Sequence, residues 1–316
     1  MSGPESDAPA FGVETWRGSV RPAYIDEMGH MNVRHYLAIA SEAMVGLAGA
    51  LGMPRAFASA SAATLRPREH HVRFLHEARV RAGLYMRCAV LEMGESDARI
   101  LQVLFHAATH QPAAAITAWV DHVTPGDMRP FPFSKATRRL AEGLMTEAPD
   151  YALPRGLAAP SPFGPAGAVE GDALGLLRTG SGALMPAEAD VFGLMAPEHL
   201  LERISHSMAH QLDRSRLAVE AMLPDLEGRL GGAMVELRQT YRRWPRVGAR
   251  LELRSGLVGA TAKMTHLLHW LLDPATGQAW AEADMLTVNF DLQARKAIEL
   301  PEQALALVRR DQLPRR

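Results

Sequence analysis

The sequence predicts an α+β protein made of two domains of the same kind, each with one long helix followed by an antiparallel sheet. Three observations predict this. A ten-residue pattern at Asp26 returns in weakened form at Asp190, an apolar helical stretch follows each copy, and four segments with two-residue alternation follow each helix. At 316 residues and 47 % hydrophobic content, the chain is long enough for two ordinary domains with their own cores.

The two copies of the pattern run from Asp26 to His35 and from Asp190 to His199. Asp, Gly, Met and His recur at the same places, and each pair is separated by 164 residues. Four identical residues in ten are modest evidence for a repeat on their own. The shared order of helix and strands after each copy supports the same interpretation. Together they indicate an internal repeat.

In the first half we expect a helix from about Asn32 to Leu51, ended by the sequence Gly-Met-Pro that follows it. Its apolar residues share one face, and the stripe predicted to be buried consists of Tyr36, Ala40, Ala43, Met44, Leu47 and Ala48. The strands expected after the helix are 70–76, 84–91, 99–108 and 114–123.

The second half repeats this order, with strands expected at 235–242, 250–257, 262–272 and 279–290. In the first of these strands, apolar residues such as Leu237 alternate with charged ones such as Glu236 and Arg238, which predicts one solvated face. Residues 129–180 are rich in Pro, Gly and Ala, with one short helix expected near 134–145 and capped by Ser134. The predicted domains are therefore 1–135 and 165–316, joined by a connecting segment at 136–164.

Five residues near the N-terminus carry a family resemblance. In the order Asp26-x-x-Gly29-His30-x-Asn32-x-x-x-Tyr36, they resemble the signature of the hotdog-fold thioesterases of the 4-hydroxybenzoyl-CoA thioesterase type. The resemblance implies tandem hotdog domains, each an antiparallel sheet wrapped around a long helix. Because such sheets pair in the family, it also implies an intramolecular pseudo-dimer. The implied activity is hydrolysis of an acyl-CoA or acyl carrier protein thioester.

Within this family, Asp26 corresponds to the residue that either attacks the acyl carbon or activates water, and the sequence leaves both roles open. Proximity to a helix start favours the carboxylate anion, whereas burial opposes it. The structural alternative is that Asp26 only caps the helix. His30 and Asn32 are the other expected catalytic residues, which would orient substrate or water, although His30 would also fit a structural role.

The substrate-binding residues that we expect are Gly29, Met31, Val33 and Tyr36. Glycine at position 29 would permit a left-handed turn or close approach of the substrate. The backbone N–H groups from Met31 to Val33 are candidates for holding the oxyanion, with Val33 at the place of the family's donor. Tyr36 follows one helical turn later and also fits the core.

The second copy keeps Asp190 but replaces His30 and Asn32 with Leu194 and Ala196. Pro197 stands at the equivalent of Val33, and proline has no backbone N–H to donate. The sequence therefore predicts one complete site at Asp26 and a second half that is mainly structural.

Composition excludes several other classes of function. The net charge of −1 provides no basic field for nucleic acid or an anionic membrane, and no apolar run is long enough to cross one. The single cysteine, Cys88, is expected to pack in a strand. The N-terminal residues lack the pattern of a secretory signal, so we expect a cytoplasmic protein. Assembly of pseudo-dimers into a homo-oligomer is left open.

No metal site is expected, because His206 and His210 share a helix face but no Glu follows His206 as in H-E-x-x-H. No redox or other cofactor is expected beyond coenzyme A as part of the substrate. The basic stretch from Arg66 to Arg73 is expected to be a solvated strand edge, with contact to coenzyme A phosphates as the alternative. Two other functions are kept open: a double-hotdog acyl-CoA hydratase or dehydratase, and a non-catalytic acyl-CoA-binding module.

Overall fold

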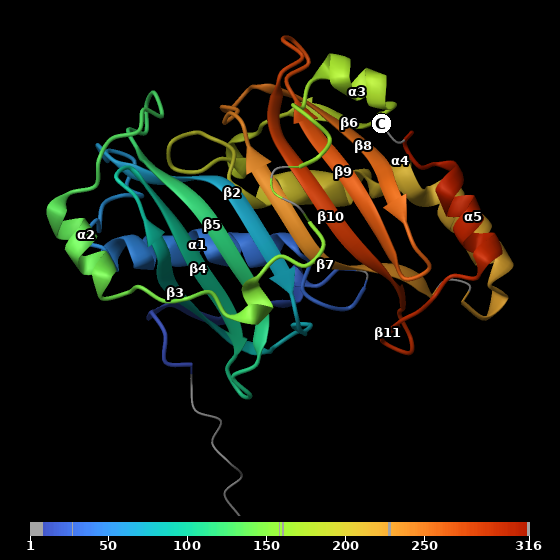
Figure 1. Ribbon diagram of the computed structural model, residues 1–316, viewed down its shortest axis with the longest axis horizontal. Coiled ribbons are helices and arrows are strands. Elements are labelled where there is room, and N and C mark those ends of the chain that lie inside the picture. The colour runs from blue at the N-terminus through green and yellow to red at the C-terminus, as the bar shows by residue number, and fades with distance from the viewer. Residues whose placement is uncertain (1–8, 27, 158, 160, 227–228, 315–316) are drawn as a thin grey trace, which may run out of the picture. The chain divides into compact units, whose positions relative to one another are not determined.

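The computed structural model describes residues 9–26, 28–157, 159, 161–226 and 229–314. The chain divides into two compact units, Met1–Leu153 and Pro154–Arg316. Each unit contains one antiparallel sheet with one long helix against it (Figure 1). None of the helices within these described residues is long and apolar enough to cross a membrane.

The sheet of the first unit has the strand order β1-β3-β4-β5-β2. Its strands are β1 (Val13–Ser19), β2 (Thr64–Phe74), β3 (Gly83–Met93), β4 (Asp97–His106) and β5 (Pro112–Val123). The four predicted strands are confirmed, and β2 begins six residues earlier than expected. The unpredicted strand β1 forms the edge of the sheet beside β3, with Val13 opposite Cys88.

Helix α1 (Arg34–Ala50) supplies the main core of the first unit. Its whole predicted stripe is buried, together with His35, Leu37 and Ile39. The helix is also tied to the sheet by a polar contact, because the buried Gln102 side chain donates to the Ala40 carbonyl at 2.8 Å. Since Gln102 is fully enclosed, losing this contact would leave a polar group unsatisfied, which fixes where the helix sits on the sheet.

Cys88 packs inside β3, as the sequence predicts. Its thiol lies 3.0 Å from the Thr15 hydroxyl of β1, and burial raises the pKa of the thiol to about 11. A thiol that stays protonated at neutral pH is a poor nucleophile, so the role of Cys88 is packing.

The second unit repeats the arrangement with the order β7-β10-β9-β8-β6. Its strands are β6 (Leu177–Ala183), β7 (Leu230–Tyr241), β8 (Arg250–Ala260), β9 (Met264–Leu272), β10 (Ala279–Asp291) and the short β11 (Lys296–Ala297), which pairs with β10. The long helix is α4 (Glu198–Met222), and α5 (Glu302–Arg310) packs beside it (Figure 1). The edge strand β6 was not predicted, and it pairs with β8 as β1 pairs with β3.

The Pro/Gly/Ala-rich segment contains α2 (Lys135–Glu142), η2 (Asp150–Ala152) and α3 (Ala168–Leu174). The predicted cap of α2 is present, because the Ser134 hydroxyl accepts from the N–H of Thr137 at 3.0 Å. In the first unit, Ala152 of η2 packs on the outer face of the sheet with Tyr85 and Phe105. In the second unit, α3 covers Leu268, Trp270 and Leu272 in the same way.

This coverage corrects the prediction that β7 has a solvated face. Glu236 is only 2 % exposed, and its carboxylate accepts hydrogen bonds from the N–H groups of Arg155 and Gly156 at 3.0 and 2.9 Å. Two such bonds compensate for the removal of the carboxylate from water. Alternation of apolar and charged residues therefore identified the strand correctly but not the exposure of its outer face.

Candidate active site

The turn before α1 brings the predicted catalytic residues together. The N–H of Asp26 donates to the His30 carbonyl at 3.1 Å, and the N–H of Gly29 donates to the Asp26 carbonyl at 3.0 Å. Gly29 closes this turn with a φ of +76°, a left-handed conformation that glycine adopts without strain. Ile25 and Met31 form an isolated antiparallel bridge at its base. The turn therefore fixes the position of Asp26 relative to the helix start.

The Asp26 carboxylate is held by groups of the same turn. Its side chain is 12 % exposed; Oδ1 accepts from the N–H of Met28 at 3.0 Å, and Oδ2 accepts from the Asn32 side chain at 3.3 Å. The other side-chain atom of Asn32, Oδ1, accepts from the N–H of Arg34 at 3.1 Å. Asn32 thus links the carboxylate to the first residue of α1 and orients both. His30 Nδ1 lies 3.7 Å from Asp26 Oδ1, close enough for attraction but too far for a hydrogen bond.

The structure narrows the oxyanion candidates to one. The N–H of Met31 donates to the Ala78 carbonyl, and that of Asn32 donates to the Tyr24 carbonyl, both at 2.8 Å. Within the described part of the chain, no group accepts a hydrogen bond from the N–H of Val33. This donor sits at the N-cap position of α1, where the helix dipole favours negative charge.

Tyr36 lies buried in the first turn of α1, beside this arrangement. It is 4 % exposed, its hydroxyl is hydrogen-bonded to the backbone of Ala78, and burial raises its pKa. Its ring meets Phe74 edge-on, with ring centroids 5.2 Å apart. Because Ala78 also accepts from Met31, the segment that follows β2 is attached both to the turn, at Met31, and to α1, at Tyr36.

Tyr24 and Ala78 were missed by sequence reasoning. They act through backbone carbonyls, which every residue possesses, so no side-chain signal could have identified them. The sequence could at most show that Tyr24 lies just before the Asp26 turn. It belongs to η1 (Pro22–Tyr24), and its ring stacks on the His35 ring, with ring centroids 4.1 Å apart.

The second unit reproduces the same backbone turn. The N–H of Asp190 donates to the Leu194 carbonyl, that of Gly193 donates to the Asp190 carbonyl, and Gly193 has a φ of +73°. Met195 donates to the Pro245 carbonyl as Met31 donates to Ala78. The Asp190 carboxylate accepts from the N–H groups of Phe192 and Leu194.

The chemistry differs although the backbone agrees. Ala196 has no side-chain amide to orient Asp190, and Leu194 replaces the imidazole of His30. Pro197 has a φ of −53° and a ψ of −37°, close to −56° and −28° at Val33, so it fits the same backbone without an N–H. The second turn keeps its shape and lacks the oxyanion donor.

One group of possible metal ligands occurs among the described residues. Glu188, His199 and Glu202 have ligand atoms within 4.8 Å of one another. The guanidinium of Arg203 contacts both oxygens of Glu188, at 2.6 and 2.8 Å. Since this cation already neutralises Glu188, the group is an ion-pair network of the second unit.

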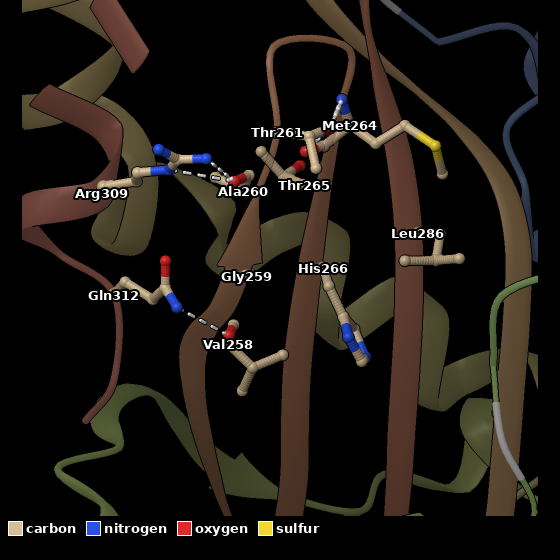
Figure 2. Close-up of a pocket in the computed structure, with 10 residues that line it drawn as sticks. All are labelled: Val258, Gly259, Ala260, Thr261, Met264, Thr265, His266, Leu286, Arg309 and Gln312. Carbon is tan, nitrogen blue, oxygen red and sulfur yellow. Dashed lines mark hydrogen bonds between the residues drawn. The ribbon is translucent and has the colours of Figure 1, made fainter. Parts of the chain in front are cut away.

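The second unit contains a cavity of about 310 Å³, lined by parts of β8, β9 and β10 and by Arg309 and Gln312. Figure 2 shows the lining residues. His266 lines the cavity and lies 3.0 Å from the buried carboxylate of Asp284. Hydrolytic triads contain a histidine held by a carboxylate, but the ten lining residues of this cavity include neither serine nor cysteine as a nucleophile. A second cavity, of about 470 Å³, lies between α4 and β6.

Most of the basic stretch of β2 is buried, which corrects the prediction of a solvated edge, while the Arg68 side chain stays 42 % exposed. Arg66, His70, His71 and Arg73 are each less than 9 % exposed, and burial lowers the pKa of His70 to about 4. Arg73 donates to the Leu153 carbonyl at 2.8 Å. Hydrogen bonding to the covering segment offsets the free-energy cost of burying this cation. Composition alone did not indicate that this segment covers β2.

Comparison with known proteins agrees with this geometry. A family model described as the thioesterase-like superfamily matches the chain twice, over residues 20–139 and 185–308. The chain therefore belongs to the thioesterase-like superfamily, and its class is that of the thioester hydrolases. The two matched segments each contain one copy of the turn, so the predicted tandem arrangement is confirmed.

Solved structures share the fold at low sequence identity. A 12:0-ACP thioesterase from Umbellularia californica has a TM-score of 0.62 at 11 % identity, covering 87 % of this chain and 93 % of that one. An acyl-ACP thioesterase from Bacteroides thetaiotaomicron has a TM-score of 0.59 at 10 % identity, covering 86 % and 96 %. A Lactobacillus plantarum protein, provisionally described as an oleoyl thioesterase, has a TM-score of 0.64 at 11 % identity, covering 93 % and 99 %. No curated protein sequence matches the chain significantly.

Proposed function

We propose that this protein hydrolyses an acyl thioester of coenzyme A or of an acyl carrier protein at a single site built around Asp26. The observation that carries the proposal is the pairing of a fixed carboxylate with the uncommitted N–H of Val33 at the start of α1. Thioester hydrolysis needs both: a group that delivers the attacking oxygen and a donor for the charge that develops on the carbonyl oxygen. The family membership supports the same reaction type.

In the proposed reaction, water adds to the thioester carbonyl while Asp26 accepts its proton. The N–H of Val33 donates to the oxyanion of the tetrahedral intermediate, where the positive end of the helix dipole adds to the stabilisation. When the intermediate collapses, the carbon–sulfur bond breaks, and the thiolate takes up the proton that Asp26 received. The products are a free acid and a thiol.

Direct attack by Asp26 is the other route, through a mixed anhydride that water then hydrolyses. Single turnover in ¹⁸O-labelled water reveals the anhydride route when water attacks the Asp26 carbonyl and not the acyl carbonyl of the anhydride. Water attack on the thioester leaves Asp26 unlabelled, whereas water attack on the Asp26 carbonyl of an anhydride places ¹⁸O in that side chain. In either route Asn32 holds the carboxylate, and the role proposed for His30 is to contact substrate or water.

The proposal is tested with Asp26→Asn. The amide is nearly isosteric but neither accepts a proton at neutral pH nor attacks the thioester, so turnover should fall by at least about 10²-fold. A screen of thiol release over short, long, aromatic and polar acyl-CoAs would first identify a substrate for the native chain. Asp190→Asn is the matched control, because the second turn lacks the donor, and it should leave the rate unchanged. Retention of native activity by Asp26→Asn would contradict the proposal.

The pairing of the two domains as a pseudo-dimer and the cytoplasmic location remain predictions from the sequence.

A further inference from the structure

A short turn of the first unit carries exposed arginines next to the active-site turn. It comprises residues Arg79, Val80 and Arg81, between β2 and β3, and is here called the arginine turn. Both arginines are exposed, and Val80 is 46 % exposed between them. The turn begins directly after Ala78, whose backbone contacts Met31 and Tyr36.

The arginine turn is fixed at its other end as well. The N–H of Arg81 donates to the Val20 carbonyl at 2.9 Å, and the N–H of Val20 donates to the Ala82 carbonyl at 3.0 Å. Arg21, which follows Val20, is thereby placed on the adjoining segment. Arg81 follows Ala78 by three positions, so the backbone of Arg81 lies at most about 11 Å from that of Ala78. Three arginines are thus held near the Asp26 turn.

The second unit has the equivalent loop, with Arg246 and Val247 at the places of Arg79 and Val80 and glycine at the place of Arg81. Gly248 donates to the Leu184 carbonyl and Leu184 donates to the Ala249 carbonyl, as Arg81, Val20 and Ala82 do in the first unit. Gly248 has a φ of +87°, and Arg81 has a φ of +66°. Glycine adopts this left-handed conformation freely, whereas arginine is strained in it. The first unit therefore places a strained cation where the second has glycine.

Among the described residues, no side-chain contact of Arg81 offsets this strain. His110 also has a positive φ, but its ring is hydrogen-bonded to the Tyr85 hydroxyl at 2.7 Å. The guanidinium of Arg81, by contrast, has no hydrogen bond or ion pair with any residue that the structure describes. Of the other two arginines, Arg79 lies 3.7 Å from Glu77, and Arg21 lies over the Tyr24 ring. The region keeps a net positive charge that faces solvent.

We propose that the arginine turn and Arg21 bind the phosphate of the pantetheine arm that carries the acyl group into the site. This inference rests on the proposed function, because it names the part of the thioester substrate that the turn recognises. Arginine presents several N–H donors in a planar fork that matches phosphate oxygens. The 4′-phosphate is common to coenzyme A and to the prosthetic group of acyl carrier proteins, so both carriers would use the same site.

The key variant is Arg81→Gly, which copies the residue of the second unit. It removes the cation and also the backbone strain, so a loss of binding could not be attributed to unfolding. Binding of coenzyme A should weaken by about three- to tenfold at low ionic strength, and less at high salt. Binding of pantetheine, which has no phosphate, should not change, and the melting temperature should stay equal or rise.

Arg55→Gly is the matched control. Arg55 is an exposed cation beyond the far end of α1, and the 17 residues of that helix separate it from the motif by about 26 Å. Its removal should leave the dissociation constants of coenzyme A and pantetheine unchanged. The same measurement with 4′-phosphopantetheine and with a holo acyl carrier protein shows which carrier uses the turn.

The outcomes separate this inference from the proposed function. Three results would each overturn the phosphate site. The native chain and Arg81→Gly could bind coenzyme A equally, Arg81→Gly could lose as much affinity for pantetheine as for coenzyme A, or the native chain could bind no phosphate-bearing carrier. If coenzyme A binding weakens as expected but no thioester is hydrolysed, the phosphate site stands and the proposed activity fails. If thioesters are hydrolysed and Arg81→Gly binds carriers like the native chain, the activity stands and the phosphate site fails.

Discussion

Replacing Val33 with proline should inactivate the enzyme without unfolding it. The substitution removes one hydrogen atom from the proposed oxyanion site and introduces into the first unit the residue that the second unit already has. Proline normally disrupts a helix, but at a helix start its fixed φ is compatible and its missing N–H has no partner within the helix. The φ values of −56° at Val33 and −53° at Pro197 show that the backbone already has the required shape.

Proline also restricts the backbone conformation of the residue before it, which would be Asn32 in this variant. The second unit shows that the turn is compatible with this restriction. Ala196, which precedes Pro197, donates its N–H to the Glu188 carbonyl at 3.0 Å, just as Asn32 donates its N–H to the Tyr24 carbonyl at 2.8 Å. We therefore expect little change in folding free energy. Loss of one preorganised oxyanion donor typically raises the activation free energy by about 2.7–4 kcal/mol, so kcat should fall by about 10²–10³-fold.

The assay is thiol release from a substrate that the native chain hydrolyses, with the melting temperature measured on the same samples. Val33→Ala keeps the N–H and is the control for loss of the side chain, so its kcat should remain within about threefold of the native value. Native kcat in folded Val33→Pro would refute the assignment of this N–H. An equal loss of kcat in both variants would show that the side chain, and not the donor, matters.

Two further predictions concern the matched turns and a buried histidine. Gly29→Ala and Gly193→Ala should each lower the free energy of unfolding by about 1 kcal/mol, because both glycines have a positive φ and an added methyl group would meet no neighbour. Only Gly29→Ala should also reduce turnover. Equal losses of activity in the two variants would contradict this. His269 is hydrogen-bonded to the Ser255 hydroxyl, and burial lowers the pKa of its imidazole to about 3. Below about pH 6.5 this histidine therefore binds a proton in the unfolded chain but not in the folded chain. Stability should therefore fall by about 1.4 kcal/mol per pH unit below 6.5. Gln102 lies opposite Cys88 in the first unit as His269 lies opposite Ser255 in the second, so His269→Gln introduces the first unit's residue. This variant should lack the pH-dependent component in denaturation curves at pH 5 and 7, and an equal pH dependence in variant and native chain would argue against the assignment.

The parts of the fold that could be predicted are those whose side chains report their surroundings directly. The buried stripe of α1 and the strands after it alternate at the periods that helices and sheets impose. The edge strands β1 and β6 escaped prediction because an edge strand needs few apolar residues, and β6 contains Gly180 and Gly182. Pairing with β3 and β8 determines them instead.

The exposure of the outer faces could not be predicted for a related reason. Charged residues such as Glu236 and Arg73 indicate a solvated surface when a strand is considered alone. In the folded chain, Gly156 and Leu153 of the covering segment provide backbone partners for these charges. A segment rich in proline and glycine gives no sign in its own composition of which surface it will cover.

The sequence by itself determined the repeat, the helix start, and the presence of Asp26, Gly29, His30 and Asn32 in one turn, because contacts within a few residues are set by local spacing. Only the tertiary structure decided which backbone donor remains available. Met31 and Asn32 have the same N–H group as Val33, but carbonyls of Ala78 and Tyr24, brought close by folding, occupy the first two. Hydrogen-bond partners of the backbone depend on distant segments, so the composition of the turn alone could not distinguish the three donors.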